Sequence, residues 1–245
     1  MSQALLPLAV RPETARPSRQ TGLLSHAFLV LQKDLTLEWR TRTRMNALVF
    51  FAVATLLLFS FALGPNTTLL RQHAAGYLWL AVLFSSVLAL GESFRVESEN
   101  AALDGLRLVP TDARAIFLGK SIGNALLLFS LSLLLLPIMV AVYDVSITEG
   151  FWKLACVEAI GCLAISAPGT LYAAIATQSR ARDVLLPLLL FPLLVPALLA
   201  AVKATSLVLS GDPMGQLSSW LKLLGGFNLI YWCLGFLLFP KVIED

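Results

Sequence analysis

Residues 91–121 read GESFRVESENAALDGLRLVPTDARAIFLGKS and form the longest charged stretch between the hydrophobic runs of this chain. The segments on both sides of it are almost entirely apolar. The 245-residue chain is 58% hydrophobic and only 13% charged, with a mean hydropathy of +0.80. A soluble domain needs roughly 25% charged residues to cover its surface. The composition therefore excludes a soluble protein and predicts an integral membrane protein.

Six apolar runs predict membrane-spanning helices, because about 20 helical residues cross a hydrocarbon core about 30 Å thick. The runs cover residues 45–63, 75–90, 119–142, 151–177, 184–209 and 219–239. The sequence therefore predicts an all-α, polytopic membrane protein with six transmembrane helices. In the fifth run, Pro187, Pro192 and Pro196 each remove a backbone hydrogen bond, so we expect a kinked or broken span. We expect Pro240 to end the sixth span.

The chain before the first span divides into two parts. Residues 1–22 have a short apolar patch followed by Pro and Arg, which is the wrong order for a secretory signal. They predict a disordered tail in front of a single transmembrane domain over residues 23–245.

Residues 25–44 are too charged to cross a membrane, but their apolar residues recur at helical spacing. We expect an amphipathic helix in the plane of the headgroups with Trp39 at the interface. The alternative is a helix that packs on a partner protein. The apolar positions are Phe28, Leu31, Leu35 and Trp39, and the charged positions include Lys33, Asp34, Glu38 and Arg40.

Lysine and arginine are divided unequally between the two sides of the predicted membrane protein. Six spans place both termini on one side, with the helix before the first span, the 91–121 stretch and the loop around residue 180. Cytoplasmic segments carry the excess of basic residues, so we expect all of these to be cytoplasmic. The other side holds only Arg71, Lys153, Lys203 and Lys222 of the chain's 18 basic residues.

The 91–121 stretch has the features of a short amphipathic helix on the cytoplasmic face. Two glutamates lie where such a helix would begin and an arginine where it would end, which suits the helix dipole. Two leucines three residues apart would share one face, and a proline would stop the helix. The residues of this pattern are Glu97, Glu99, Leu103, Asp104, Leu106, Arg107 and Pro110. Asp112 is placed to cap the next helix, which continues into the third span.

The end of this stretch, residues 118–121, resembles the end of a phosphate-binding P-loop. That motif has its first glycine five residues before the second, and Arg114 occupies this position. The chain therefore does not bind ATP through that motif. We expect Lys120 to extend instead to the lipid headgroups. Gly119 and Gly123 have the GxxxG spacing that lets another helix approach closely.

Other reactive side chains are few. The odd number of cysteines, all inside apolar runs, predicts small apolar fillers rather than disulfides. They are Cys156, Cys162 and Cys233. His26 and His73 fall on opposite sides of the predicted membrane and cannot share a metal ion. The sequence contains no HExxH and no GxSxG motif, which leaves no basis for a hydrolase.

Glu158 is the strongest intramembrane candidate, because ionisable groups inside a membrane are functional candidates by default. It lies about two turns into the fourth span, and Lys203 lies toward the outer end of the fifth. The alternative for both is that their side chains reach the outer headgroups. Glu158 would be the proton or ion site of a self-sufficient secondary transporter, whose inverted repeats the two halves of this chain do not display.

Four groups of residues, in this order, carry a resemblance. They are Lys33-Asp34-Leu35 with Glu38-Trp39-Arg40, Glu97-x-Glu99 with Leu103-Asp104-Gly105-Leu106 and Pro110, Gly119-Lys120, and Leu185-Leu186-Pro187 with Pro192 and Pro196. Together with the six spans they resemble the CcmB family, the membrane subunit of the haem-exporter-type ABC transporter of cytochrome c maturation. The resemblance covers about residue 25 to the end of the chain.

The resemblance implies a non-catalytic permease of the ABC-2 type in the bacterial inner membrane. Two copies would pair with two copies of a separate, CcmA-like ATPase subunit that uses ATP, and residues 92–118 would form the helix that couples to it. A CcmC-like haem-handling membrane protein and a CcmE-like haem chaperone are the other implied partners, beside membrane lipid. Haem would be the cargo or would leave on the chaperone, without a cofactor bound by this chain. An ABC-2-type permease for another cargo is the remaining alternative, and nothing in the sequence indicates a nucleic-acid partner.

Overall fold

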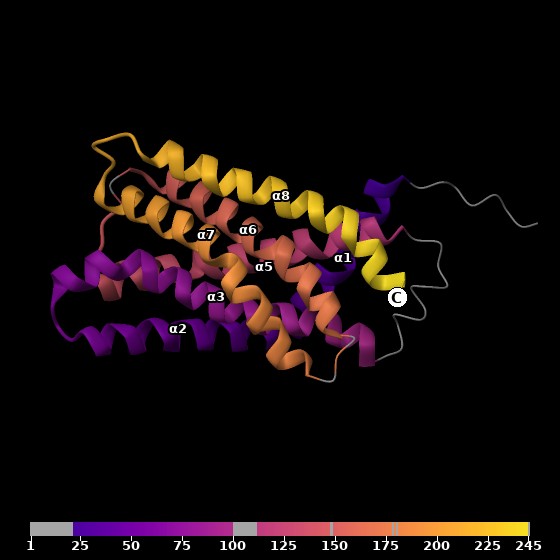
Figure 1. Ribbon diagram of the computed structural model, residues 1–245. Helices are drawn as coiled ribbons and strands as arrows, with labels where there is room; N and C mark the ends of the chain where they lie inside the picture. The colour runs from indigo at the N-terminus through magenta and orange to yellow at the C-terminus, as the bar shows by residue number, and fades with distance from the viewer. Residues whose placement is uncertain (1–21, 100–111, 148, 178, 180, 245) are drawn as a thin grey trace, which may run out of the picture.

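The computed structural model describes residues 22–99, 112–147, 149–177, 179 and 181–244. Regular secondary structure in these residues is α-helical throughout (Figure 1). The helices are α1 (Leu23–Thr41), α2 (Thr43–Leu63), α3 (Thr67–Glu99), α5 (Ala113–Tyr143), α6 (Phe151–Thr177), α7 (Arg182–Ser210) and α8 (Leu217–Glu244). The all-α fold is therefore confirmed for the described part of the chain.

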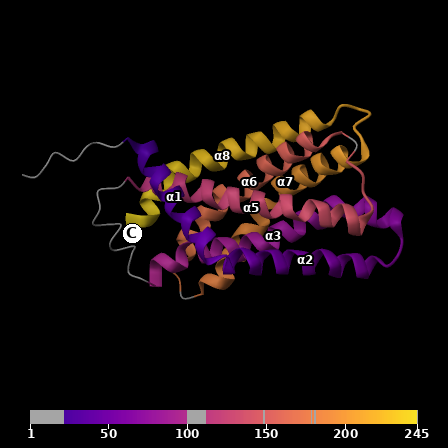
Figure 2. The same cartoon turned by 180° about the vertical axis from the view of Figure 1, so that it is seen from behind.

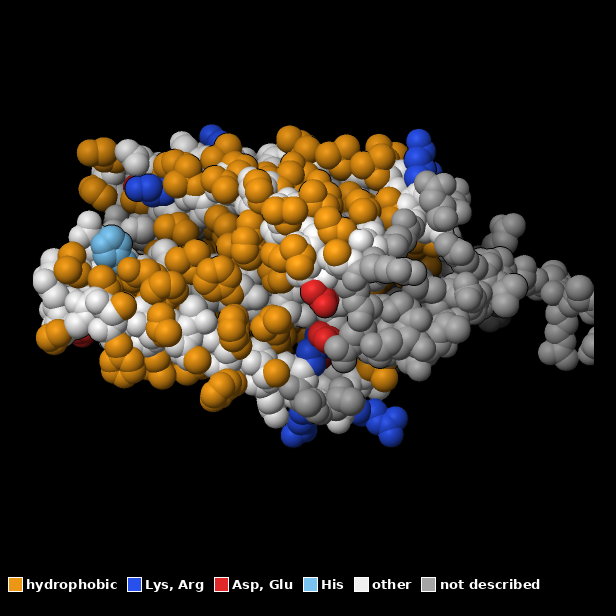
Figure 3. Space-filling model, turned by 60° about the horizontal axis from the view of Figure 1, so that its bottom comes forward, with side chains coloured by type: hydrophobic (Ala, Val, Ile, Leu, Met, Phe, Trp, Pro, Cys, Tyr) orange, Lys and Arg blue, Asp and Glu red, His pale blue; other side chains and the backbone are white. Residues whose placement is uncertain are grey.

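Six of these helices are long and apolar enough to cross a membrane. The spans are Arg44–Leu63, Thr67–Phe94, Ala113–Tyr143, Phe151–Thr177, Asp183–Ser210 and Leu217–Ile243. This confirms the six predicted spans. On the face shown in Figure 3, hydrophobic side chains cover most of the length of the bundle, and lysine and arginine side chains lie toward its ends.

The bundle has two distinct ends (Figures 1 and 2). At one end, which we call the α1 end, α1 packs on the first turns of α5. The last turns of α3 and α8 lie at this same end of the bundle. The connections from α2 to α3, from α5 to α6 and from α7 to α8 lie at the opposite end. The described helices thus alternate in direction as six consecutive spans require.

Helix α6 forms the centre of the bundle and packs against α3, α5, α7 and α8. Its apolar window is 72% buried, compared with only 17% for α2 and for α8. The large side chains in the core include Trp79, Tyr143 and Phe117, all of which are fully buried. The outer helices α2 and α8 therefore present most of their apolar surface to the surroundings of this chain.

Helix α3 is longer than the predicted span over residues 75–90. It begins at Thr67 because the Asn66 side chain accepts hydrogen bonds from the backbone N–H groups of Thr68 and Leu69, at 3.1 and 3.2 Å. An Asn at this position supplies an acceptor to the otherwise unpaired first turn of a helix. At its other end α3 extends to Glu99, well beyond the apolar run.

The prolines do not interrupt the helices. We expected a kinked or broken span here. Helix α7 is continuous from Arg182 to Ser210 across Pro187, Pro192 and Pro196, which excludes the break but not the kink. Helix α8 likewise continues through Pro240 to Glu244. A membrane helix retains all its other backbone hydrogen bonds across a proline, and leaving the helix would expose more unpaired groups to lipid.

The start of α5 agrees with the sequence prediction. The Asp112 carboxylate accepts a hydrogen bond of 2.9 Å from the backbone N–H of Arg114, and the helix begins at Ala113. Asp112 is thus the predicted N-terminal cap. Residues 113–118 belong to the same continuous helix as the third span, which directs the chain from the α1 end into the bundle.

Candidate functional site

Helix α1 packs directly on the first turns of α5. A Cβ atom at Gly119 would lie 2.7 Å from the carbonyl oxygen of Ala27 and 2.8 Å from Cβ of Val30. Only glycine permits this approach of the two helices. Gly123 makes a looser contact, since a Cβ atom added there would lie 3.5 Å from Cδ1 of Leu31. The close approach that the GxxxG spacing predicted is confirmed at Gly119, and the approaching helix is α1.

Lys120 is buried beneath this contact rather than extended to the headgroups. Its side chain is only 2% exposed, and its Nζ lies 3.5 Å from Oδ2 of Asp34 on α1. The ammonium group also donates a 2.9 Å hydrogen bond to the carbonyl oxygen of Ser93 and lies 4.7 Å from the ring centre of Phe94. The predicted snorkelling of Lys120 is wrong, because α1 covers the side chain and provides the opposite charge.

A second ion pair joins α1 to the same end of the bundle. Arg44, at the start of the first span, bonds Oε2 of Glu38 on α1 at 3.1 Å. Its other terminal nitrogen donates to the carbonyl oxygen of Ala89 on α3 at 2.5 Å. Arg44 thus connects α1 and α2 to α3.

A polar chain continues from Lys120 toward the centre of the bundle. The amide nitrogen of Asn124, one turn further along α5, donates to Oγ of Ser93 at 3.3 Å and to Oγ1 of Thr170 at 3.0 Å. Thr170 belongs to α6, so the contacts extend from α1 through α3 and α5 to the central helix. We call the residues Asp34, Glu38, Arg44, Ser93 and Lys120 the α1 junction.

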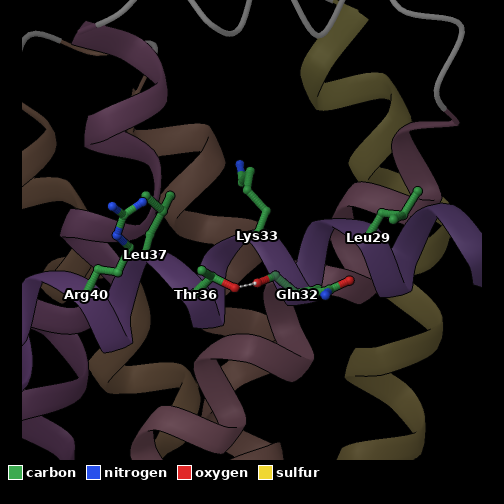
Figure 4. Close-up of a pocket in the computed structure, with 6 residues that line it drawn as sticks. All are labelled: Leu29, Gln32, Lys33, Thr36, Leu37 and Arg40. Atoms are coloured by element: carbon green, nitrogen blue, oxygen red, sulfur yellow. Dashed lines mark hydrogen bonds between the residues drawn. The ribbon is translucent and has the colours of Figure 1, made fainter.

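The face of α1 away from the bundle is exposed and carries both apolar and polar side chains. A shallow groove of ≈ 390 Å³ runs along it (Figure 4). Its lining residues, all on α1, are Leu29, Gln32, Lys33, Thr36, Leu37 and Arg40. Trp39 is 76% exposed and lies under the guanidinium group of Arg42, 5.6 Å from the ring centre. Such a face suits the boundary between lipid and water.

The charged residues predicted on this helix thus have two different placements. Asp34 and Glu38 face the bundle and pair with Lys120 and Arg44. Lys33 and Arg40 line the outer groove, although Lys33 also pairs with Asp34 at 3.3 Å.

The predicted coupling residues lie at the edge of the described structure. Glu97 and Glu99 belong to the last turn of α3, so they end a long helix instead of beginning a short one. The other five predicted residues lie outside the described residues, and they are Leu103, Asp104, Leu106, Arg107 and Pro110. The α1 junction holds the helices on both sides of this stretch, through Ser93 and Lys120.

Glu158 lies inside the bundle. Its side chain is fully buried, so the alternative that it reaches the outer headgroups is wrong. The hydroxyl groups of Ser132 and Thr205 lie beside its carboxyl group, but neither carboxyl oxygen has a hydrogen bond of good geometry. Lys203 is exposed, as the alternative for that residue required. The described residues contain no group of three or more His, Cys, Asp or Glu side chains that could hold a metal ion.

The sequence alone did not pair Lys120 with Asp34. The sequence did contain one indication of a partner. Lys120 lies between Gly119 and Gly123, whose spacing predicts a closely packed neighbouring helix, and a lysine buried by such a helix needs an opposite charge from it. What the sequence lacked was the identity of the neighbouring helix. The spacing of 86 residues between the partners gives no local pattern.

These features define a class: a multi-pass α-helical membrane protein whose amphipathic first helix is fastened to the entrance of its transmembrane bundle. The profile of the family described as "CcmB protein" matches residues 25–244, nearly the whole chain. The chain therefore belongs to the CcmB family.

Named relatives agree with this assignment. The protein is 30% identical over 190 residues to "Heme exporter protein B" of Paracoccus denitrificans, a match that covers 77% of this chain and 86% of the relative. It is 29% identical over 209 residues to the protein of the same name from Pseudomonas aeruginosa, covering 84% and 92%. The Rhodobacter capsulatus protein of that name is 28% identical over 170 residues, covering 69% and 78%.

Proposed function

We propose that this protein is the membrane subunit of an ABC transporter that acts in cytochrome c maturation, with haem as its cargo or as the load of a chaperone that it releases. Membership of the CcmB family supports this function, as do relatives named for haem export. Six helices of spanning length supply the membrane part. In this proposal the subunit is non-catalytic, and a separate ATPase hydrolyses ATP.

The ATPase acts on residues 92–118 at the α1 end. The observation that supports this is the α1 junction, which ties both helices flanking that stretch to α1 and, through Asn124 and Thr170, to α6. A displacement of the stretch would therefore move α1, α3 and α5 together. Contiguous packed side chains and hydrogen bonds are the physical means by which such coupling travels.

Charge reversal tests this docking site. We expect Glu97→Lys together with Glu99→Lys, or Leu106→Asp alone, to abolish co-purification with the ATPase while the protein still inserts into the membrane. Lys222→Glu, on the exposed surface near the opposite end of the bundle, is the matched charge-reversal control. Normal recovery of the ATPase with the Glu97 and Glu99 variants would show that another surface receives it.

The α1 end faces the cytoplasm in this proposal, because the described basic residues at that end outnumber those at the opposite end, which are Arg71, Lys153, Lys203 and Lys222. Single cysteines at Met214 and Lys241, in a variant without the three native cysteines, report the orientation. Both positions are exposed. Met214 lies in the connection between α7 and α8 and Lys241 in the last turns of α8, so they are at opposite ends of α8. A membrane-impermeant maleimide added to intact spheroplasts should label the cysteine at position 214 and leave the one at position 241 unmodified; the reverse pattern contradicts the orientation.

The partners within the membrane are a second copy of this chain and a CcmC-like haem-handling protein, with a CcmE-like haem chaperone at the outer side. Helices α2 and α8 have the least buried spans and so the largest apolar faces for such neighbours. Cysteine crosslinking from Leu58 on α2 and Leu237 on α8, both exposed, distinguishes them. If a second copy packs against one of these helices, the cysteine on that helix should crosslink two copies of this chain to each other.

A further inference from the structure

Glu158 belongs to a buried polar cluster in the half of the bundle opposite α1. Four helices contribute to it: Trp79 from α3, Ser132 from α5, Glu158 and Cys162 from α6, and Thr205 from α7. All five side chains are at least 99% buried. The permease function proposed above gives this cluster no role.

The two hydroxyl groups beside Glu158, those of Ser132 and Thr205, already form hydrogen bonds with other groups. The Thr205 hydroxyl accepts a 2.9 Å hydrogen bond from the indole N–H of Trp79, which leaves its own proton to donate. The Ser132 hydroxyl donates at 3.0 Å to the backbone carbonyl of Phe129 and accepts the Cys162 thiol at 3.9 Å. Ser132 can therefore accept a hydrogen bond from Glu158 but has no proton left to donate to it.

This division of donors and acceptors matches a neutral carboxylic acid. Its carbonyl oxygen would accept from Thr205 and its own O–H would donate to Ser132. An ionised carboxylate only accepts hydrogen bonds, so it would face one donor and one lone pair. Burying a charge with so few donors is costly, and proteins avoid it by neutralising the group.

The neighbours of Glu158 also favour a neutral carboxylic acid, because none of those named below carries a positive charge. The helices packed against α6 place Trp79, Ser132 and Thr205 near it, and Cys162 is the titratable neighbour on α6 itself. From α8, the Asn228 amide nitrogen donates to the Ile160 and Leu224 carbonyl oxygens, both at 3.0 Å. Among the described residues no lysine, arginine or histidine forms an ion pair with Glu158.

We propose that Glu158, with Ser132 and Thr205, is a proton-binding site of the permease. In the conformation described here Glu158 holds its proton as a neutral acid. When the contacts of α6 with α5 and α7 loosen at this level, water enters, accepts the proton and leaves the carboxylate hydrated. Opening of this part of the bundle is thereby linked to proton release, and closing to proton uptake.

Infrared difference spectroscopy on the full-length protein in lipid nanodiscs tests the site. We expect the carbonyl stretch of a protonated carboxylic acid in wild type at neutral pH and its loss in Glu158→Gln, which has nearly the same shape. Glu149→Gln is the control, because Glu149 lies outside the spans and pairs with Lys153, and should leave that band unchanged. A wild-type spectrum without the band, or a band that survives in Glu158→Gln, overturns the proposal.

A second measurement needs no variant that must fold. A hydrophobic carbodiimide modifies protonated carboxyl groups within membranes, and peptide mass spectrometry locates the modified residue. We expect modification of wild-type Glu158 at neutral pH that falls at least tenfold in strongly alkaline buffer. Protection by sodium ions at constant pH would identify a metal-cation site instead, and no modification of Glu158 would show an ionised group; either result overturns the proposal.

Discussion

Lys120 on α5 and Asp34 on α1 form an ion pair, with 3.5 Å between Nζ and Oδ2, although 86 residues separate them in the chain. Two of the segments by which the sequence resembles the CcmB family therefore meet at one point, Lys33-Asp34-Leu35 and Gly119-Lys120. The pair lies beside Ser93, near the end of α3, because the Lys120 ammonium also donates to the Ser93 carbonyl oxygen. This arrangement makes α1 a part of the transmembrane domain rather than an independent membrane anchor.

Removing the carboxylate should destabilise this junction. In Asp34→Asn the Lys120 ammonium, 2% exposed, loses its ion pair with Asp34, while its contacts with the Ser93 carbonyl and the Phe94 ring remain. We expect a loss of about 1.5–3 kcal/mol in the free energy of unfolding, the range of hydrogen bonds to charged groups. Thermal or denaturant unfolding of the protein in detergent micelles measures it.

The double variant Asp34→Asn/Lys120→Met is the control for this effect. Because methionine leaves no buried charge, the double variant should be more stable than Asp34→Asn alone. The interaction between the two substitutions should be about 0.5–3 kcal/mol, as for contacting residues. Additive effects would mean that the two side chains act independently.

Gly119 is predicted to set the distance between α1 and α5. Gly119→Val would place side-chain atoms against the backbone of Ala27 and against Val30, already 2.7 and 2.8 Å from a Cβ. We expect α1 to separate from α5, at a cost of about 1–3 kcal/mol for an overpacked contact. Limited proteolysis of the protein in nanodiscs should then cleave within residues 23–41 faster than in wild type.

The matched control is Gly123→Ala, one turn away on the same helix. Its Cβ would meet only Leu31 Cδ1, at 3.5 Å, which is ordinary contact. Wild-type cleavage rates are expected for it. Equal cleavage of both variants would indicate that helix packing at Gly119 does not hold α1.

The fold was largely predictable from the sequence because apolar runs of spanning length report membrane helices directly. The prediction failed where polar residues or prolines lie inside a membrane helix. The span over residues 75–90 was placed too short, since Arg71 and His73 belong to the first two turns of α3. Pro187 was expected to kink or break its span and Pro240 to end its span, whereas both helices continue across these residues.

The candidate site was only partly predictable. Composition singled out Glu158, because a carboxyl group in an apolar run is conspicuous, and Asp112 was recognisable as a cap from local sequence. The partners of Glu158 could not be found in this way. Ser132 and Thr205 are ordinary residues of two other spans, and only the packing of α5 and α7 on α6 brings them to it.

The ion pair between Glu149 and Lys153 predicts a small pH dependence at the opposite end of the bundle. The 2.6 Å hydrogen bond from Lys153 lowers the pKa of Glu149 below its ordinary value of 4.5. A lowered pKa in the folded state means stabilisation that is present above the ordinary pKa and lost as pH falls through the lowered one. Lys153→Ala should therefore reduce the difference in unfolding temperature between pH 7 and pH 3, and an unchanged difference would refute the assignment.

Gly161 is predicted to be irreplaceable in the centre of the bundle. A Cβ at this position would lie 2.1 Å from Cη2 of Trp79, whose fully buried ring is fixed by its indole hydrogen bond to Thr205. Gly161→Ala should destabilise the protein by about 1–3 kcal/mol, although alanine favours a helix over glycine by up to about 1 kcal/mol.

The control is Gly226→Ala on α8, where the added Cβ meets nothing within 4 Å, so this variant should gain the helix propensity of alanine without a clash. Unfolding measured side by side should thus shift in opposite directions for the two substitutions. A Gly161→Ala protein as stable as Gly226→Ala would mean that Trp79 can move, and that the polar cluster around Glu158 is looser than the packing of α3 on α6 requires.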